Sequence, residues 1–241
     1  MDFSFSLSCY NILMLQFTHV YVASLLESSR GIKNRGDYYL GATIPDARYF
    51  AGVQRERTHI SRSEVKPTFG AQCSDDFLAG YDVHLAFDEY MYDGVNIANV
   101  VRMFPFFLRS FFDRSVIEVV FDFYCIERKD TLEKVAISDT YLSALENVGI
   151  DGGSFVVFVR TVKNMLGGGF FRAFRDEMMN DPRFRNNPRL TRLDKAVQFV
   201  EKHPKVQLYL LNRARPEIEN ISGMFVENFD IPTPDSYNSC S

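Results

Sequence analysis

Tryptophan is absent from this sequence, and its cysteines are few and scattered. The aromatic residues are 23 Phe and 12 Tyr, and none of the four cysteines forms a C-x-x-C pair. A zinc knuckle and a thioredoxin-like redox motif both need such pairs and are therefore excluded. Scattered cysteines are typical of free thiols in a reducing compartment, so we expect a cytoplasmic protein.

An excess of positive charge is also missing. With 27 Lys and Arg against 31 Asp and Glu, the net charge is −4. Recognition of nucleic acid normally requires a basic surface, so we expect no nucleic acid as partner. The 241 residues, of which 46% are hydrophobic and 24% charged, suffice for one globular domain with its own core.

The chain has no long apolar run free of polar residues. Residues 3–26 contain no charged residue, but Ser, Asn, Gln, Thr and His interrupt them, and no basic region precedes them as in a signal peptide. The second candidate, residues 103–125, carries two arginines, one glutamate and two aspartates. Because such residues penalise insertion, we expect no transmembrane segment.

The pattern that is present predicts an all-α fold, a single-domain bundle of helices. Ser74 followed by two aspartates predicts a helix start, since a hydroxyl cap and early acids suit a helix N-terminus, and this helix should run to about Tyr92. Thr18 is expected to cap an earlier helix that ends near Gly31. Other helices are expected over residues 37–41, in 95–128, over 139–148, in 151–179, over 191–200 and over 206–220.

Some segments are ambiguous or lie outside the expected core. The run FVVFV, residues 155–159, fits a buried strand as well as a buried helix. Residues 1–13 carry no helix cap and no candidate ligand, so we expect an N-terminal extension, with Met14 as the functional start. The domain should then span residues 14–229 and contain the metal site, and residues 230–241 should form a disordered tail.

Polar residues with metal-binding chemistry occur on the predicted helix after Ser74. His84 and Asp88 are four residues apart, so they share one helical face with the apolar side chains of Phe77, Tyr81 and Met91. A carboxylate on a buried face must be paired or bound to a metal, because burying an isolated charge is prohibitive. A hydrogen bond between His84 and Asp88 explains the pair as well as a metal ion does.

Three further residues complete a candidate site. His19 lies at the start of the first predicted helix, Asp46 follows Pro45, and His59 follows Thr58. Taken alone, each has an ordinary explanation as a helix-end, turn or surface residue. Together with His84 and Asp88 they form a set of nitrogen and oxygen donors that suits zinc, with iron or manganese as alternatives.

In order and context, these residues resemble the zinc-dependent phospholipase C superfamily, which includes the P1-type nucleases and the N-terminal domain of glycosylphosphatidylinositol phospholipase D. The resemblance covers about residues 15–92 and rests on His19, then YYLGATIPDARYF, RTHIS and FLAGYDVHLAFDE. It implies that zinc is bound by all five candidates, and that the aspartate bridging two metals is Asp46.

The sequence also departs from that superfamily. Its well-studied members hold three zinc ions and use a second H-x-x-x-D/E helix, which this chain lacks, so one or two metals is the most it supports. Glu118 and Asp122 could supply further carboxylates or could pair with arginine at the core edge. The remaining histidine, His203, fits a solvated helix end.

Arginines surround two of the candidate ligands. The planar guanidinium fork binds phosphate in a bidentate way, although the same residues also fit an exposed basic loop. With a metal-activated water they predict a phosphoester site whose catalytic residues are Asp46, Arg48 and Arg57. The arginines concerned are Arg48, Arg55, Arg57 and Arg62.

Three functions compete. The first is a metal-dependent phosphoester hydrolase, phospholipase C-like, that acts on a small-molecule or lipid phosphoester. The second is a non-catalytic helical protein with a structural metal site that binds a partner. The third, an HD-type phosphohydrolase, is disfavoured because the chain contains no His-Asp dipeptide.

Overall fold

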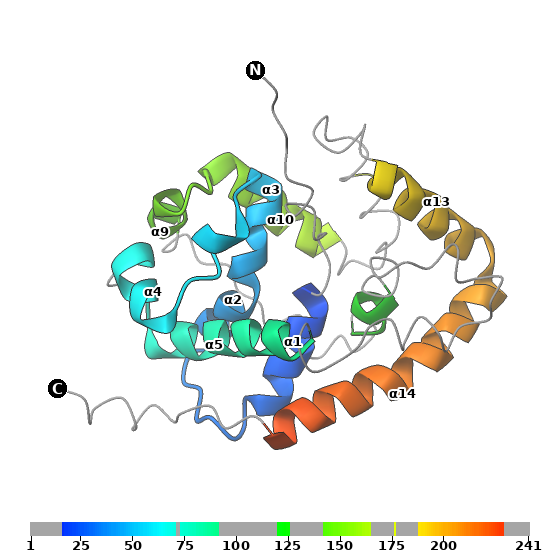
Figure 1. The fold of residues 1–241 in the computed structure, drawn as a ribbon, viewed down its shortest axis with the longest axis horizontal. Coiled ribbons are helices and arrows are strands. Elements are labelled where there is room, and N and C mark those ends of the chain that lie inside the picture. The colour runs from blue at the N-terminus through cyan, green and yellow to red at the C-terminus, as the bar shows by residue number, and fades with distance from the viewer. Residues whose placement is uncertain are drawn as a thin grey trace.

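A computed structural model describes residues 16–70, 73–91, 120–125, 142–164, 176 and 188–228. These residues are mostly helical and contain no strand, which confirms the all-α prediction (Figure 1). Residues 1–13 and 230–241, and most of 95–128, lie outside them. The elements are α1 (Gln16–Leu26), α2 (Arg35–Thr43), η2 (Ile44–Ala47), α3 (Arg48–Ala51), η3 (Arg55–Arg57), α4 (Arg62–Phe69), α5 (Asp75–Glu89), α9 (Leu142–Asn147), α10 (Gly152–Asn164), α13 (Pro188–Lys202) and α14 (Pro204–Asn228).

The first helix begins earlier than its predicted cap. Thr18 lies inside α1, and its backbone N–H and its hydroxyl both donate to Oδ1 of Asp122, at 2.9 and 2.8 Å. The prediction that Thr18 is the N-cap is therefore wrong, because a carboxylate about a hundred residues away satisfies this first-turn N–H. The helix ends at Leu26, and the turn that follows closes at Gly31, whose φ is +61°.

Two glycines let α2 and α5 cross in backbone contact. A Cβ on Gly41 would clash with the carbonyl oxygen of Phe77, and a Cβ on Gly80 would clash with that of Tyr38. Only glycine permits this approach, and α2 and α5 form the most extensive contact between described helices. The crossing sets where the last turns of α5 lie relative to the end of α2.

The N-terminal ends of the same two helices are tied together by hydrogen bonds. Ser74 caps α5 as predicted, its Oγ accepting from Phe77 N at 3.1 Å and donating to Asp37 of α2 at 2.6 Å. In return, Asp76 of α5 accepts the backbone N–H of Asn34, the cap of α2, at 2.6 Å. These reciprocal contacts fix both the spacing and the orientation of the pair.

The later helices differ from prediction mainly in length. Residues 155–159 are helical, within α10, so the strand alternative is wrong. Both α13 and α14 begin at a proline, Pro188 and Pro204, since proline suits the first helical position, where no N–H is needed. The last helix continues through Pro216 to Asn228, well beyond the predicted residue 220.

The C-terminal helix packs across the end of α5 through aromatic rings. Phe225 meets Phe87 edge-on with ring centroids 5.1 Å apart, and it lies 5.5 Å from Tyr90. Phe87 in turn meets the His19 ring at 5.6 Å. Aromatic packing thus links α14 to the histidine-bearing helices. Within the residues that the structure describes, no helix is both long and apolar enough to cross a membrane.

Candidate metal centre

Five side chains from separate parts of the chain converge in the fold. His19 comes from α1, Asp46 from η2, His59 from the turn after η3, and His84 and Asp88 from α5. Ligand atoms of His19, His84 and Asp88 lie within 4.8 Å of one another, and so do those of Asp46, His59 and His84. The structure therefore brings together all five residues that the sequence predicts as metal ligands, and His84 belongs to both groups.

This cluster is shielded from water. The exposed fractions are 0% for His84, 1% for His19, 4% for Asp88 and 5% for Asp46, and the His59 side chain is 4% exposed. Buried carboxylates and imidazoles need partners for each polar atom, because an unpaired one carries its full desolvation cost. The hydrogen bonds of each ring therefore show which of its nitrogen atoms is left to bind a metal ion.

A backbone hydrogen bond assigns the tautomer of His84. Its Nδ1 lies 2.8 Å from the carbonyl oxygen of Ala42, at the α2–α5 crossing. A carbonyl only accepts, so Nδ1 carries the proton, and in the neutral ring Nε2 is a bare lone pair pointing into the cluster. A ring nitrogen held by a backbone carbonyl in this way is typical of metal-binding histidines.

The ring of His59 is arranged in a similar way. Its Nδ1 lies 3.1 Å from Oγ1 of Thr58, whose hydroxyl points to the carbonyl oxygen of Arg55 at 3.4 Å. With that hydroxyl proton engaged, Oγ1 can accept from Nδ1, and in this tautomer Nε2 of His59 is a second lone pair. The Nε2 atoms of His59 and His84 are only 3.3 Å apart.

His19 lies between the two carboxylates. Its Nε2 is 3.2 Å from Oδ1 of Asp88, and its Nδ1 is 3.9 Å from Oδ2 of Asp46. Its ring stacks on that of His84, with centroids 3.9 Å apart and planes 13° from parallel. The other oxygen of Asp88 contacts Nε2 of His59 at 3.2 Å, and the other oxygen of Asp46 lies 3.9 Å from Nε2 of His84. Each carboxylate therefore spans two imidazoles.

The surroundings shift the pKa values of the three histidines in different directions. Burial, reinforced by the charge of His19, lowers the pKa of His84 well below its usual value, and burial also lowers the pKa of His59. Burial would lower the pKa of His19 too, but its hydrogen bond to Asp88 and the charges of Asp88 and Asp46 outweigh burial and raise that pKa. Near pH 7, His84 and His59 are therefore neutral.

The carboxylates differ from each other as well. Burial would raise the pKa of Asp88, but its contacts with the rings of His19 and His59 and the charge of His19 outweigh burial and hold that pKa well below its usual range. Burial raises the pKa of Asp46, and the charges of His19 and Arg48 oppose that rise only in part. Asp88 is thus the carboxylate whose negative charge the surroundings favour most.

This arrangement suits a bound cation. The Nε2 atoms of two neutral imidazoles lie 3.3 Å apart, and the oxygens of two buried carboxylates surround them. Lone pairs and carboxylate oxygens repel one another unless a positive charge lies between them. Because all donors are nitrogen or oxygen, these buried groups could hold a metal ion of the hard-to-borderline kind.

Two arginines accompany the cluster. Nη2 of Arg55 donates to Oδ2 of Asp88 at 2.6 Å, and the Arg55 side chain is 34% exposed, so it links the buried cluster to solvent. Arg48 is only 3% exposed, and its charge favours the ionised form of Asp46. The sequence predicted a catalytic role for Arg48 and did not single out Arg55.

The other two arginines of the predicted set point elsewhere. Arg57 is exposed, and its Nη1 would be 3.1 Å from a Cβ placed on Gly149. Arg62 forms an ion pair with Asp82 between α4 and α5. A catalytic role for Arg57 stays a prediction, and Arg55 is the arginine in contact with a candidate ligand.

Sequence reasoning missed a tyrosine that fixes the histidine-bearing turn. The hydroxyl of Tyr81 donates to the carbonyl oxygen of Thr58 at 2.5 Å and accepts the N–H of Ile60 at 2.9 Å. Both bonds flank His59, so α5 positions this ring although His59 belongs to another segment. The sequence predicted only that Tyr81 lies on the buried face of its helix. The spacing of apolar residues does not indicate which groups its hydroxyl bonds.

Neither Asp122 nor His203 belongs to the two groups of ligand atoms. Asp122 caps α1 through Thr18, as described above, and Glu118 falls outside the described residues. His203 is exposed, with Nδ1 2.7 Å from the carbonyl oxygen of Phe199, which agrees with the predicted helix end.

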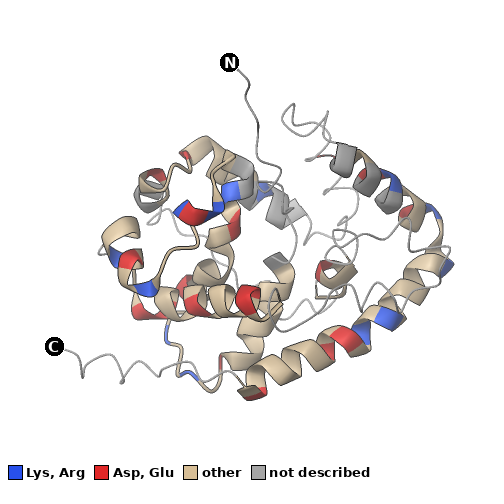
Figure 2. Ribbon diagram, viewed as in Figure 1, with Lys and Arg blue, Asp and Glu red and all other residues tan. Residues whose placement is uncertain are grey.

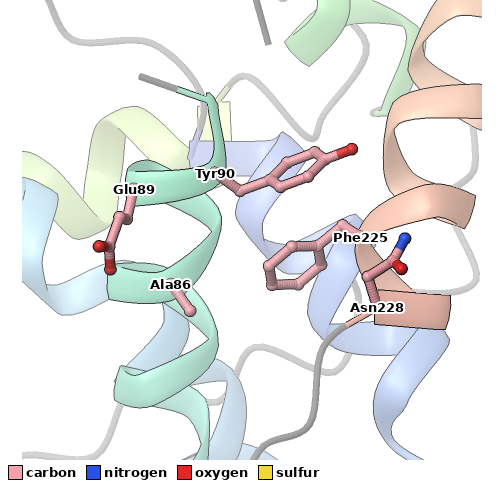
Figure 3. A pocket seen from close by; sticks show the side chains of 5 residues that line it. All are labelled: Ala86, Glu89, Tyr90, Phe225 and Asn228. Atoms are coloured by element: carbon pink, nitrogen blue, oxygen red, sulfur yellow. The ribbon is translucent and has the colours of Figure 1, made fainter. Parts of the chain in front are cut away.

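A pocket of about 240 Å³ lies between α5 and α14, lined by Ala86, Glu89, Tyr90, Phe225 and Asn228 (Figure 3). Residues two apart on a helix point about 200° apart. Ala86 and Tyr90, each two residues from a candidate ligand of α5, therefore face away from the cluster, and none of the five candidate ligands lines this pocket.

Comparisons with protein-family models, with curated proteins and with solved structures found no match for this chain.

Proposed function

We propose that this protein is a metal-dependent phosphoester hydrolase, similar in its metal centre to the zinc-dependent phospholipase C superfamily. The observation that carries the proposal is the convergence of three imidazoles and two carboxylates, with the Nε2 atoms of His59 and His84 only 3.3 Å apart. Zinc is the proposed ion because this donor set suits it, and iron or manganese are alternatives.

Within this proposal the five ligands have distinct tasks. His84 and His59 offer Nε2 lone pairs, held by Ala42 and Thr58 respectively. Asp46 and Asp88 each span two imidazoles, so either can be shared between two ions. When bound, the metal supplies a Lewis acid that lowers the pKa of a water molecule and polarises a phosphoryl oxygen.

The arginines supply the phosphate chemistry. Arg55 is partly exposed and touches Asp88, so its guanidinium can bind a phosphoryl group that approaches from solvent. Arg48, buried near Asp46, holds a fixed positive charge that stabilises negative charge developing in the site. The proposed substrate is a small-molecule or lipid phosphoester, since these groups recognise the phosphate rather than the rest of the molecule.

The compartment we propose is the cytoplasm. Cys73 and Cys125 are buried thiols that form no disulfide, which is usual for proteins that fold in a reducing environment.

One observation favours a second function. The five ligands are almost completely buried, as in structural metal sites, whereas catalytic sites keep a position open to water. On this alternative the chain is a non-catalytic helical protein that uses the metal for stability and binds a partner.

Hydrolysis assays on the full chain separate the two functions. The purified protein, analysed for zinc, iron and manganese, would be assayed on nitrophenyl phosphate, bis-nitrophenyl phosphate and nitrophenyl phosphocholine. The proposal expects turnover that His84→Ala abolishes and Arg55→Ala lowers by about a hundredfold, the usual effect of removing one charge-stabilising donor. His203→Ala, a histidine exposed at a helix end, is the matched control. Bound metal without turnover supports the structural alternative, and the absence of metal contradicts both.

A further inference from the structure

Positive charge is concentrated in one part of this acidic protein. Residues 188–216 carry seven Lys or Arg and two Asp or Glu, a net charge of +5 in a chain whose total is −4. Figure 2 shows both basic and acidic residues on the described part of α13, basic ones on the first half of α14 and acidic ones on its second half. The seven are Arg189, Arg192, Lys195, Lys202, Lys205, Arg213 and Arg215.

Apolar side chains protrude among these charges. Phe199 of α13 is 37% exposed and lies four residues after Lys195 and three before Lys202, so the three share a helix face. Leu208 of α14 is 60% exposed and lies three residues after Lys205 on one face of that helix. All three lysines are exposed.

His203 joins the two faces. Its ring lies over that of Phe199, with centroids 4.3 Å apart, and its carbonyl oxygen accepts the N–H of Val206 at 2.8 Å and of Gln207 at 3.1 Å. The end of α13 and the start of α14 are thereby held as one corner. We call this surface the basic corner: Lys195, Phe199, Lys202, His203, Lys205 and Leu208.

Two neighbouring arginines are already engaged within the protein. Arg213 lies over the ring of Tyr209 at 5.7 Å, and Arg215 over that of Tyr124 at 5.5 Å. They add to the local field, while the exposed lysines carry the surface charge that a partner meets.

We propose that the basic corner docks onto the surface of an anionic lipid bilayer. Lysines beside exposed Phe and Leu are the composition of interfacial helices, whose apolar side chains enter the headgroup boundary while the lysines contact anionic headgroups. Charge complementarity selects this occupant, because residues 188–216 carry a net charge of +5 in a chain of net charge −4 and an anionic surface attracts that part of the chain. Exposed Leu208 distinguishes a membrane from a nucleic acid, since an aliphatic side chain contributes nothing to phosphate binding. The inference is independent of the metal site.

Vesicle co-sedimentation tests this directly. The full chain would be mixed with phosphatidylcholine vesicles that contain or lack phosphatidylserine. We expect binding only to the anionic vesicles, weakened at high salt because screening shortens the reach of the lysine charges. Lys205→Glu should weaken binding by at least about fivefold, the worth of one basic residue near such a surface. Leu208→Ser should weaken it as well.

Matched variants control for charge and exposure. Val156→Ser removes an apolar side chain of α10 that is 59% exposed, almost as much as Leu208, and Lys33→Glu reverses an exposed charge between α1 and α2. Both should bind anionic vesicles as the unchanged chain does, and all variants should keep its melting temperature. The proposal would be overturned if the chain did not bind anionic vesicles, or if the control variants lost as much binding as the test variants. It would also be overturned if the chain bound single-stranded RNA but no vesicles, and Leu208→Ser left the RNA binding unchanged.

Discussion

The Asp88 carboxylate is the residue on which the cluster depends most. It contacts His19, His59 and Arg55, from three different segments. We expect Asp88→Ala to lose the metal and to lower the melting temperature, because an ion present at a thousand times its Kd stabilises the folded state by about 4 kcal/mol. Thermal melts with zinc and with a chelator check this. If Asp88→Ala kept its metal and its melting temperature, Asp88 would be a structural residue only.

Asp122 positions His19 through its neighbour Thr18. Asp122→Ala leaves the buried N–H and hydroxyl of Thr18 without this acceptor, so we expect the free energy of unfolding to fall by about 1–3 kcal/mol. Zinc affinity should fall up to about tenfold, because a residue that orients a ligand tunes the site. Asp122→Asn keeps an acceptor oxygen and should recover most of both losses. Zinc titration distinguishes the outcomes, since a purely structural role would leave affinity unchanged.

The split pKa values make the metal-free protein sensitive to pH. His84 and His59 have folded-state pKa values below that of an unfolded histidine, so the unfolded chain takes up their protons first. Their contribution to stability is therefore present above about pH 6.5 and is lost as pH falls through that value. His19, with its raised pKa, acts in the opposite direction, since its contribution is present below about pH 6.5 and is lost at higher pH.

Because the pKa of His84 lies well below its usual value and that of His59 is lowered too, we expect the net free energy of unfolding to decrease between about pH 8 and pH 5. Urea denaturation across that range in the presence of a chelator measures it. His203→Gln, at an exposed histidine, should leave the pH dependence unchanged. A stability that rises on acidification would contradict the assigned directions.

At the scale of elements, the α2–α5 crossing holds the site together. Gly80→Ala forces a methyl group into the backbone of Tyr38, which cannot move aside as a flexible side chain could. We expect a loss of at least about 1–3 kcal/mol and weaker metal binding, because the crossing places His84 on Ala42. The control is Gly223→Ala in α14, where a Cβ meets nothing within 4 Å. That change should be neutral or should stabilise by up to about 1 kcal/mol, and equal losses at both glycines would contradict the account.

Local sequence patterns predicted which segments form helices better than they predicted where those helices end or which residues they contact. The cap at Ser74 and the buried face that carries His84 and Asp88 follow from short-range spacing, and both are confirmed. The Thr18 cap was wrong because its N–H is satisfied by Asp122, a partner that no local pattern reveals. The length of α14 was underestimated because Pro216 is accommodated inside the helix.

For the molecule as a whole, the sequence predicted which residues meet but not how they are held. The five ligands were found from residue type, order and family resemblance, and the structure brings them together. The partners of their rings come from packing between distant segments: Ala42 for His84, and Tyr81 for the turn that carries His59. Arg55 was missed for the same reason. The sequence does not distinguish the four arginines of this short stretch, and only the fold shows which of them contacts Asp88.

The central claim is that His19, Asp46, His59, His84 and Asp88 hold a metal ion. An X-ray absorption spectrum of the purified full chain at the metal edge tests it most directly, because it reports the type and distance of the ligands without depending on turnover. The account predicts bound zinc, or iron or manganese, with imidazole nitrogen and carboxylate oxygen at about 2.0–2.2 Å for zinc, and loss of the imidazole pattern in His84→Ala but not in His203→Ala. Sulfur ligands at about 2.3 Å, a spectrum unchanged by His84→Ala, or a protein that binds none of these ions would contradict it.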